Sequence, residues 1–269
     1  MRYEVIHQLE IPKIGFGTWT IGGRDGPDYP ADAQSLAAMR SAIEIGYTHF
    51  DTAEYYAGGH AEELLGQAVR QSGMARDKVF ITSKVSPEHL QYADVLRCCE
   101  NSLRRLGMEY LDLYLIHWPM RGMKLAETFR ALNELVRAGK VRHLGVSNFN
   151  LKLLQQSCSL SETPLLTNQV SFSIPDREYQ NNGVLEYCQQ NNILLTAYSP
   201  VKRRNISVNK LLQTIARAHG VTSQQVALAW VAMQARVITI PKAVNPQHQL
   251  ENYQAGELIL SAAEMEQLA

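Results

Sequence analysis

Four polar residues lie at the end of, or shortly after, three short apolar runs. Together they have the side-chain groups needed to donate a proton to a substrate. Asp51, Lys84 and His117 each end one of these runs, and Tyr56 follows Asp51 by five residues. A phenol is a reluctant acid, but a neighbouring ammonium stabilises its phenolate and lowers its pKa toward neutrality. We therefore expect Tyr56 to donate a proton, helped by Lys84, which Asp51 holds charged. His117 would orient the oxygen of a carbonyl group.

Each of these residues alone also has an ordinary structural interpretation. Asp51 could cap a helix or form an ion pair, and Lys84 could be a charge on the rim of the fold. His117, followed by Trp118 and Pro119, could be a hydrogen-bonded core histidine. The catalytic interpretation rests on their joint occurrence on three successive runs, which chance placement explains poorly.

The runs belong to a regular alternation of β-rich segments and stretches with a helical period. The predicted strands are Ile14–Gly17, Thr48–Thr52, Val79–Lys84, Leu111–His117, Arg142–Ser147, Leu166–Val170, Ile193–Tyr198 and Val237–Ile240. The predicted helices are Ala31–Ile45, Ala61–Gln71, Tyr92–Leu106, Leu125–Ala138, Leu151–Ser157, Gly183–Gln190, Val208–His219, Ser223–Gln234, Gln247–Gln254 and a last one from about Ser261.

Eight such units in series predict an α/β fold, a single-domain (β/α)8 TIM barrel over residues 1–269. An open doubly wound sheet is the structural alternative. Residues before Pro12 should form a small cap under the barrel. In a barrel the carboxyl ends of the strands meet on one face, so the four polar residues would converge there.

Glycines after four of the helical stretches suggest where those helices end. A left-handed residue commonly closes a helix, and glycine adopts that conformation without steric cost. The positions concerned are Gly46, Gly107, Gly139 and Gly220.

Composition limits the possible partners. The 26 basic and 26 acidic side chains balance, so no net field attracts nucleic acid or an anionic membrane. No apolar run at the N-terminus suits a signal peptide, and no later run is long enough to span a membrane. We expect a soluble cytoplasmic monomer that takes a small-molecule substrate.

The four cysteines are Cys98, Cys99, Cys158 and Cys188. They form no C-x-x-C pair and no spacing with histidine that is typical of zinc, so we expect no metal site. Reduced thiols in the cytoplasm are the simplest interpretation. Because Cys98 and Cys99 are neighbours in a predicted helix, at most one of them should face the core.

Several segments taken together resemble the aldo-keto reductase family, in family order and across nearly the whole chain. These segments are Gly46-Tyr47-Thr48-His49-Phe50-Asp51-Thr52-Ala53 with Tyr56, Gly58, Glu62 and Gly66 behind it, Ile81-Thr82-Ser83-Lys84, Ile116-His117-Trp118-Pro119, Gly145-Val146-Ser147-Asn148-Phe149, and Ile240-Pro241-Lys242.

The resemblance implies hydride transfer from a reduced nicotinamide to a carbonyl carbon. It makes Tyr56 the general acid, Lys84 and Asp51 the residues that tune it, and His117 the residue that positions the carbonyl. It also implies cofactor contacts from Gly17, Thr18, Trp19, Ser147, Asn148, Gln169, Tyr198, Ser199, Lys242, Ala243, Val244, His248, Glu251 and Asn252.

The phosphate-binding segment departs from two patterns. Thr20 stands where a Rossmann fingerprint starting at Gly15 would need its third glycine, so phosphate contacts would come from Lys242 and the helix that starts near Pro246. Lys242 could also be only a solvated rim charge. Ala243 and His248 replace a serine or threonine and an arginine that many family members use to bind a 2′-phosphate. We expect NADPH as cofactor, with NADH also usable.

The substrate itself is not encoded in any motif. The loop from Trp118 to Leu125 is short and the chain ends in the predicted last helix, so we expect an open mouth lined by Trp19, Tyr56 and Trp118. Two other functional classes remain open. Lys84 could form a Schiff base as in barrel aldolases, or the chain could be a nucleotide-sensing regulatory subunit.

Overall fold

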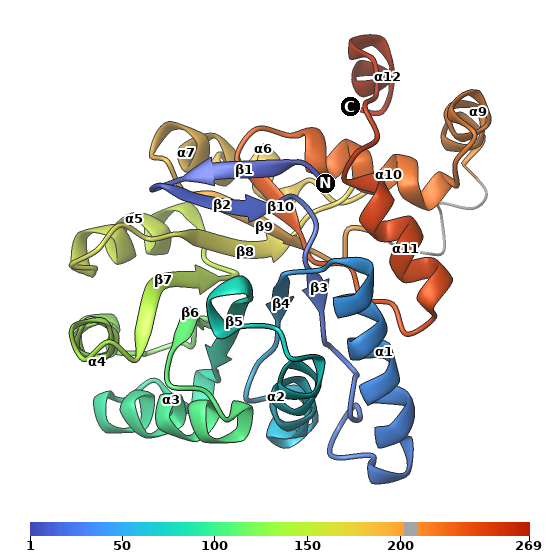
Figure 1. Cartoon of the computed structure of the whole chain (residues 1–269). Coiled ribbons are helices and arrows are strands. Elements are labelled where there is room, and N and C mark those ends of the chain that lie inside the picture. Colours follow the sequence, from blue (N-terminus) through green and yellow to red (C-terminus); the bar gives the residue numbers. More distant parts are fainter. Residues whose placement is uncertain (202–208) are drawn as a thin grey trace.

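The computed structural model describes residues 1–201 and 209–269 and forms a closed barrel of eight parallel strands ringed by helices (Figure 1). The barrel strands are β3 (Phe16–Gly17), β4 (His49–Asp51), β5 (Phe80–Val85), β6 (Leu111–Ile116), β7 (Val141–Ser147), β8 (Thr167–Ser171), β9 (Leu194–Tyr198) and β10 (Val237–Thr239). Each pairs with its sequence neighbours, and a parallel bridge between Ile14 and Thr239 joins the first strand region to the last. The predicted barrel is confirmed, and the open sheet is excluded.

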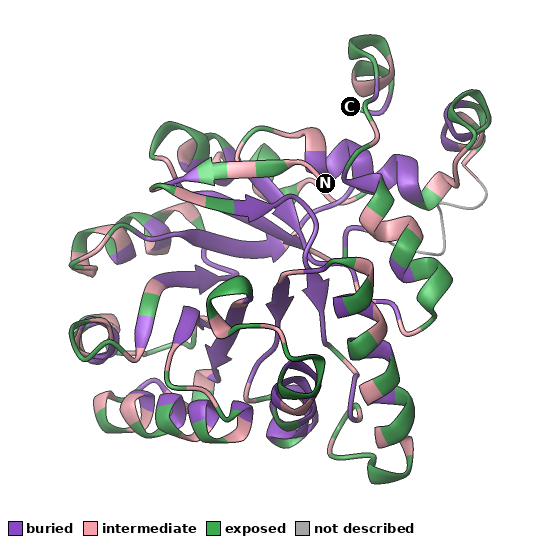
Figure 2. Cartoon of the chain, viewed as in Figure 1, coloured by how far each residue is buried: buried purple, intermediate pink, exposed green. Residues whose placement is uncertain are grey.

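The helices lie outside the strands, with their buried faces turned toward them (Figure 2). They are α1 (Asp32–Ile45), α2 (His60–Ser72), α3 (Tyr92–Leu106), α4 (Leu125–Arg137), α5 (Leu151–Leu160), α6 (Glu178–Asn181), α7 (Val184–Gln190), α9 (Lys210–His219), α10 (Ser223–Met233), α11 (Pro246–Ala255) and α12 (Ala262–Gln267). Four 3₁₀ turns are η1 (Tyr29–Ala31), η2 (Tyr56–Gly59), η3 (Arg76–Lys78) and η4 (Pro87–His89).

Most predicted helices agree with the structure to within one or two residues, and Tyr92–Leu106 agrees at both ends. The helix α5 runs three residues beyond its predicted end. The four-residue helix α6 and the 3₁₀ turns were not predicted, because segments of this length show no hydrophobic period. Val208, the predicted first residue of the helix before Gly220, lies outside the described residues.

The N-terminal cap is an antiparallel hairpin of β1 (Tyr3–Ile6) and β2 (Leu9–Pro12). Its buried residues Ile6 and Ile11 form one apolar cluster with Leu113 and Leu115 of β6, Leu166, Leu194 of β9 and Ile238 of β10. This cluster closes the amino end of the barrel, as expected. The predicted chemical residues, which end the strands, lie at the opposite, carboxyl end of the barrel.

Glycine meets two different needs in this fold. The four glycines predicted to end helices have φ between 65° and 112°, which confirms the left-handed conformation. At Gly17 the constraint is space, because a Cβ atom there would lie 2.6 Å from the carbonyl oxygen of Ile240. A side chain at Gly17 would push apart the strands that close the barrel.

The prediction that only one of Cys98 and Cys99 faces the core was wrong. Both are buried, at 3% and 0% exposure. Consecutive helical residues differ by about 100° around the axis, but α3 packs on the sheet and also between α2 and α4. Its buried arc is therefore wide enough to include both cysteines.

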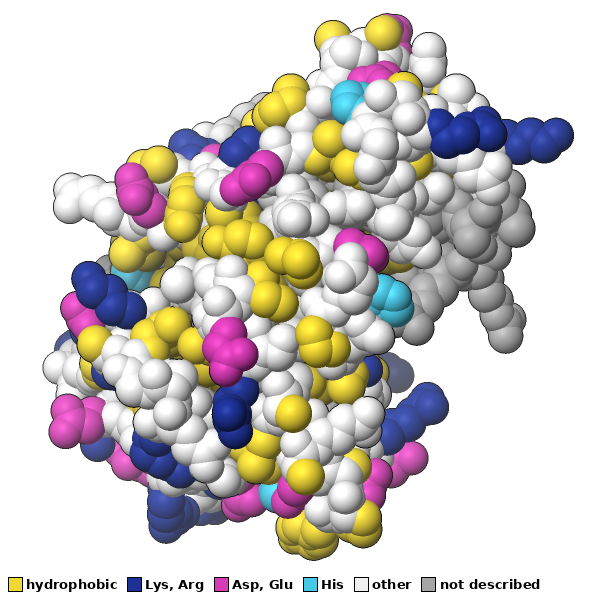
Figure 3. Space-filling model, turned by 45° about the vertical axis from the view of Figure 1, so that its right-hand side comes forward, with side chains coloured by type: hydrophobic (Ala, Val, Ile, Leu, Met, Phe, Trp, Pro, Cys, Tyr) yellow, Lys and Arg dark blue, Asp and Glu magenta, His cyan; other side chains and the backbone are white. Residues whose placement is uncertain are grey.

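The outer surface shows no dominant sign of charge on the face drawn in Figure 3, where Lys and Arg side chains are interspersed with Asp and Glu. This mixture agrees with the balanced composition of the whole chain. Within the described ranges, the model contains no helix with the length and apolar character of a membrane span.

Candidate active site

Strand register places the predicted chemical residues at one end of the barrel. Asp51 lies opposite Gly17 on β3 and opposite Thr82 on β5. Farther around the barrel, Ser147 lies opposite Gln169. Since the strands are parallel, all these residues belong to the carboxyl face, where barrel enzymes place their active sites.

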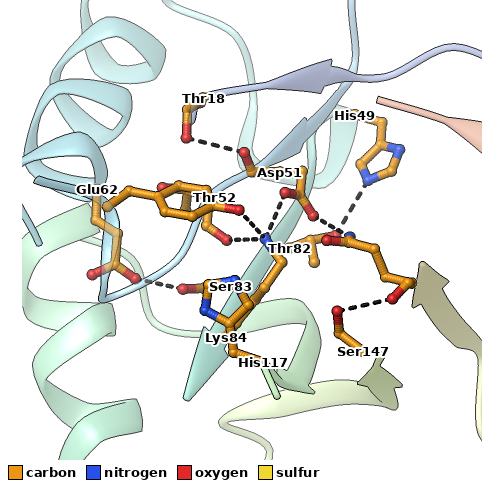
Figure 4. Close-up of polar contacts among 12 residues, drawn as sticks. Thr18, His49, Asp51, Thr52, Glu62, Thr82, Ser83, Lys84, His117 and Ser147 are labelled. Atoms are coloured by element: carbon orange, nitrogen blue, oxygen red, sulfur yellow. Dashed lines mark hydrogen bonds and ion pairs between the residues drawn. The ribbon is translucent and has the colours of Figure 1, made fainter. Parts of the chain in front are cut away.

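Lys84 is the centre of the polar network drawn in Figure 4. Its Nζ lies 2.5 Å from Asp51 Oδ1, 2.7 Å from the carbonyl oxygen of Thr52 and 3.3 Å from the hydroxyl of Tyr56. Gln169 donates to the second oxygen of Asp51 at 2.7 Å. Burial is the largest effect and lowers the pKa of Lys84, but Asp51 and Tyr56 together raise it above its ordinary value, so the ammonium stays charged although it is fully buried.

Tyr56 begins the tight turn η2, in which the next residue, Ala57, adopts a left-handed φ of 51°. A left-handed alanine stores strain, and such strain is frequent where a loop must aim a functional side chain. Burial raises the pKa of Tyr56, and Lys84 opposes that rise without overcoming it. The expectation of a pKa nearer neutrality was therefore wrong for this structure, because desolvation exceeds the attraction of the ammonium. The phenol stays protonated at neutral pH.

His117 follows β6 and lies beside Tyr56, with ring centroids 5.6 Å apart. Burial, and then the charge of Lys84, lower the pKa of His117 to about 3. The imidazole is thus neutral over the physiological range, and it can donate one hydrogen bond without carrying charge. Its carbonyl oxygen accepts a hydrogen bond from Asn148 at 3.1 Å.

The ends of β7 and β9 carry two further left-handed residues, Asn148 at φ 62° and Ser199 at φ 50°. Tyr198 donates to the side-chain oxygen of Asn148 at 2.8 Å, and Asn148 Nδ2 donates to Ser147 at 2.9 Å. Ser147 in turn donates to the carbonyl oxygen of Gln169. This chain of bonds fixes the half-buried ring of Tyr198 as a flat surface beside the catalytic end.

A cavity of about 1010 Å³ connects these groups with the segment after β10. Asp51, Tyr56 and His117 line it, whereas Lys84 lies behind them. Most of the predicted cofactor residues also line it, namely Gly17, Trp19, Ser147, Asn148, Gln169, Tyr198, Ser199, Lys242, Ala243, His248, Glu251 and Asn252.

Two predicted cofactor residues do not line the cavity, Thr18 and Val244. Thr18 is fully buried, and its hydroxyl donates to the backbone oxygen of Asp51 at 3.0 Å. Any influence of Thr18 on the cavity must therefore pass through the position of Asp51.

The sequence model of the aldo/keto reductase family matches residues 13–269. The chain belongs to the aldo-keto reductase family. A methylglyoxal reductase of Escherichia coli is 38% identical over 266 residues, covering 97% of this chain and 90% of that protein. This aldo-keto reductase is accordingly an oxidoreductase that reduces aldehydes or ketones.

Solved structures of aldo-keto reductases have the same fold as this chain. A thermostable aldo-keto reductase in complex with the inhibitor epalrestat matches with a TM-score of 0.96 at 46% identity, over 100% of this chain and 98% of that one. An aldo-keto reductase from Klebsiella pneumoniae in complex with NADP and acetate matches with a TM-score of 0.89 at 38% identity, over 100% and 94%.

The described residues fit such a cofactor, with one adjustment to the expected phosphate site. The cavity runs from Tyr56 and His117 to Lys242 and His248. At the start of α11, however, the side chain of Asn245 accepts from the amides of Gln247 and His248 at 2.8 and 3.4 Å. Those amides are already used within the helix, so a bound phosphate would need its direct contacts from side chains, and α11 could add only its dipole.

Some lining residues were not predicted: Tyr55, Pro87, Glu88, Pro200, Val201, Thr222 and Gln224. Tyr55 and Glu88 lie a few residues after the ends of β4 and β5, a position that could have identified them. Thr222 and Gln224 belong to the start of α10, where Thr222 forms a capping box. Nothing local distinguishes that box from any other helix cap, so only the tertiary structure assigns it to the cavity.

Proposed function

We propose that this aldo-keto reductase uses Tyr56 as general acid in the NADPH-dependent reduction of small uncharged aldehydes. One observation carries the assignment: Lys84 Nζ lies between Asp51 Oδ1 and the hydroxyl of Tyr56, at 2.5 and 3.3 Å. A buried charge in this position acts on the phenolate far more strongly than it would in water.

The chain's own residues supply everything except the hydride, which reduced nicotinamide gives to the carbonyl carbon. Tyr56 donates its proton to the oxygen as negative charge develops there. Lys84 stabilises the phenolate that forms, and Asp51 keeps Lys84 charged and oriented. The neutral imidazole of His117 donates a hydrogen bond that orients the oxygen.

The same geometry disfavours a Schiff-base mechanism. An amine must lose its proton before it can attack a carbonyl. Asp51 raises the pKa of Lys84 against the effect of burial, and Lys84 does not reach the cavity. The complete set of four chemical residues also favours an enzyme over a regulatory subunit.

Cofactor contacts are proposed for the predicted residues that line the cavity. Tyr198 would stack on the nicotinamide, while Ser147, Asn148 and Gln169 would hydrogen-bond to its amide. The phosphates and the adenosine would be held by the remaining residues, namely Ser199, Lys242, Ala243, His248, Glu251 and Asn252.

The substrate proposal rests on the lining of the catalytic end and on the named activity of the Escherichia coli relative. Among the described residues that line the cavity, Lys242 is the one Lys or Arg, and it belongs to the proposed phosphate segment. Glu88 near Trp118 would repel a carboxylate substrate. We therefore infer that methylglyoxal and similar short aldehydes are preferred over 2-oxo acids.

The test compares two neighbouring tyrosines in NADPH oxidation with methylglyoxal. Tyr56→Phe should lower kcat by about a hundred to ten thousand times, the usual contribution of general acid catalysis. Tyr55→Phe is the matched control, because Tyr55 is 56% exposed and Lys84 donates its hydrogen bond to the neighbouring Tyr56. It should retain most of the activity. Near-normal turnover in Tyr56→Phe would exclude Tyr56 as the acid.

We further propose that the chain works as a single-domain monomer in the cytoplasm. The four cysteines are unpaired, as is usual in a reducing compartment. Light scattering after gel filtration would test the monomer.

A further inference from the structure

A second polar cluster lies behind the wall of the active-site cavity. Glu54, His89 and Cys98 each present one donor atom, and these three atoms lie within 4.8 Å of one another. Glu54 comes from the loop after β4, His89 from η4 and Cys98 from α3. Among the residues that the structure describes, this is the one cluster of this kind. It takes no part in the proposed reduction.

The three side chains suit a transition metal rather than calcium or magnesium. One thiol, one imidazole and one carboxylate make the mixed S, N, O set that zinc accepts, whereas the hard cations prefer oxygen alone. With bonds of about 2.0 to 2.3 Å, tetrahedral ligand atoms stand roughly 3.5 Å apart. The three donor atoms lie within 4.8 Å of one another, and Glu54 Oε1 lies 3.0 Å from His89 Nδ1.

The surroundings supply the support that such a site needs. Glu54 is held by the amide of Ser86 at 2.7 Å, so its carboxylate is fixed before any ligand binds. Cys98 is almost fully buried, whereas the side chain of His89 is 42% exposed and leaves a path from solvent.

We propose that Glu54, His89 and Cys98 form a zinc-binding site, with the fourth position open to water. On binding, the Cys98 thiol releases its proton to solvent, and the thiolate, His89 Nδ1 and a Glu54 oxygen coordinate the metal. The site joins the loop that carries Tyr55 and Tyr56, the turn that carries Pro87 and Glu88, and α3. An occupied site would fix one wall of the cavity. This inference does not depend on the proposed substrate or acid.

The test titrates the full-length protein with Co²⁺, in saturating NADP⁺ so that the catalytic cavity is filled. We expect one Co²⁺ per chain with a thiolate-to-cobalt charge-transfer band, which Zn²⁺ abolishes by displacement. Cys98→Ser should lose the band, and Cys99→Ser, which removes a neighbouring buried thiol outside the cluster, should keep it. No band in the wild type, or a band that survives Cys98→Ser, overturns the proposal.

A second measurement covers the possibility that Cys98→Ser does not fold. His89→Gln changes a partly exposed side chain, and it should weaken Zn²⁺ binding at least about tenfold. Zn²⁺ should raise the melting temperature of the wild type and leave that of His89→Gln nearly unchanged, because a ligand stabilises only the state that binds it. Equal shifts in both proteins, or no shift in the wild type, would also overturn the site.

Discussion

At the scale of single residues, the buried pair of Lys84 and Asp51 links catalysis to stability. Lys84 has no exposed side-chain surface and Asp51 has 2%. Removing one partner leaves the other as an uncompensated charge in the interior, which typically costs about 3 to 5 kcal/mol. A substitution of Lys84 therefore affects more than the acidity of Tyr56.

Lys84→Met should lower turnover by at least about a hundredfold and reduce the free energy of unfolding by about 3 kcal/mol or more. The double variant Asp51→Asn with Lys84→Met should regain part of the stability and none of the activity, since no buried charge remains. Chemical denaturation and NADPH oxidation measure the two effects. If Lys84→Met were as stable as the wild type, the pair would not be the buried ion pair described above.

A second residue-scale prediction concerns cofactor choice. His248 lines the cavity at an exposed position, and arginine there would offer a charged fork to the 2′-phosphate of NADPH. His248→Arg should tighten NADPH binding roughly tenfold at pH 8 and leave NADH nearly unchanged.

Fluorescence titration of both cofactors measures this preference. Gln247→Arg is the matched control, because it adds the same charge one residue away at a position that does not line the cavity. If the ratio of NADPH to NADH affinity is the same in the wild type and in His248→Arg, His248 does not contact the 2′ position.

At the scale of elements, His60 joins the first turns of α1 and α2. Its Nε2 lies 2.7 Å from Asp32 Oδ1 and its Nδ1 lies 2.8 Å from Glu63 Oε2. Burial lowers the pKa of His60, but Glu63 and Asp32 together raise it above the ordinary value. The folded state therefore favours the charged imidazole, which both carboxylates hold.

This linkage predicts a pH-dependent stability. Because the folded pKa lies above the unfolded one, near 6.5, the contribution is complete below that value and is lost as pH rises through the folded pKa. The melting temperature of the wild type should fall between about pH 6 and pH 9 by more than that of His60→Gln. Parallel melting curves for the two proteins across this range would show that His60 does not stabilise the helix junction.

At the scale of the whole molecule, the mouth of the barrel determines how selective the enzyme is. Trp19, Tyr55 and Trp118 are 41%, 56% and 47% exposed, and the rings of Trp19 and Tyr55 stack with centroids 6.2 Å apart. Aromatic surfaces of this kind discriminate by modest apolar terms, about 1 to 3 kcal/mol for each methylene-sized difference.

A series of short aldehydes that differ by single methylene groups should therefore show kcat/KM values within about two hundredfold between neighbours. Glyoxylate, which carries a carboxylate, should be reduced more slowly than methylglyoxal because Glu88 lines the same cavity. Steady-state kinetics over such a panel test both statements. A single aldehyde preferred over close relatives by several orders of magnitude would contradict the open mouth.

The sequence alone predicted the barrel and the polar residues that meet at its carboxyl face, because both depend on local order along the chain. Alternating apolar periods predicted the eight barrel strands to within two residues, and the parallel arrangement brings strand ends together whatever the loops do. Asp51, Lys84 and His117 could therefore be grouped from their positions at strand ends. The family resemblance supplied the cofactor segment.

Only the tertiary structure decided the pKa shifts and the burial of individual side chains, because these depend on depth in the fold and on residues that are distant in the sequence. Desolvation raises the pKa of Tyr56 by more than Lys84 lowers it. The relative size of these two effects cannot be read from the residue types. Likewise, Cys98 is buried with Cys99 because α3 packs on three sides, and the same packing brings Cys98 to Glu54 and His89. Sequence spacing excluded a zinc motif along the chain, but ligands on three separate elements meet through packing and not through spacing.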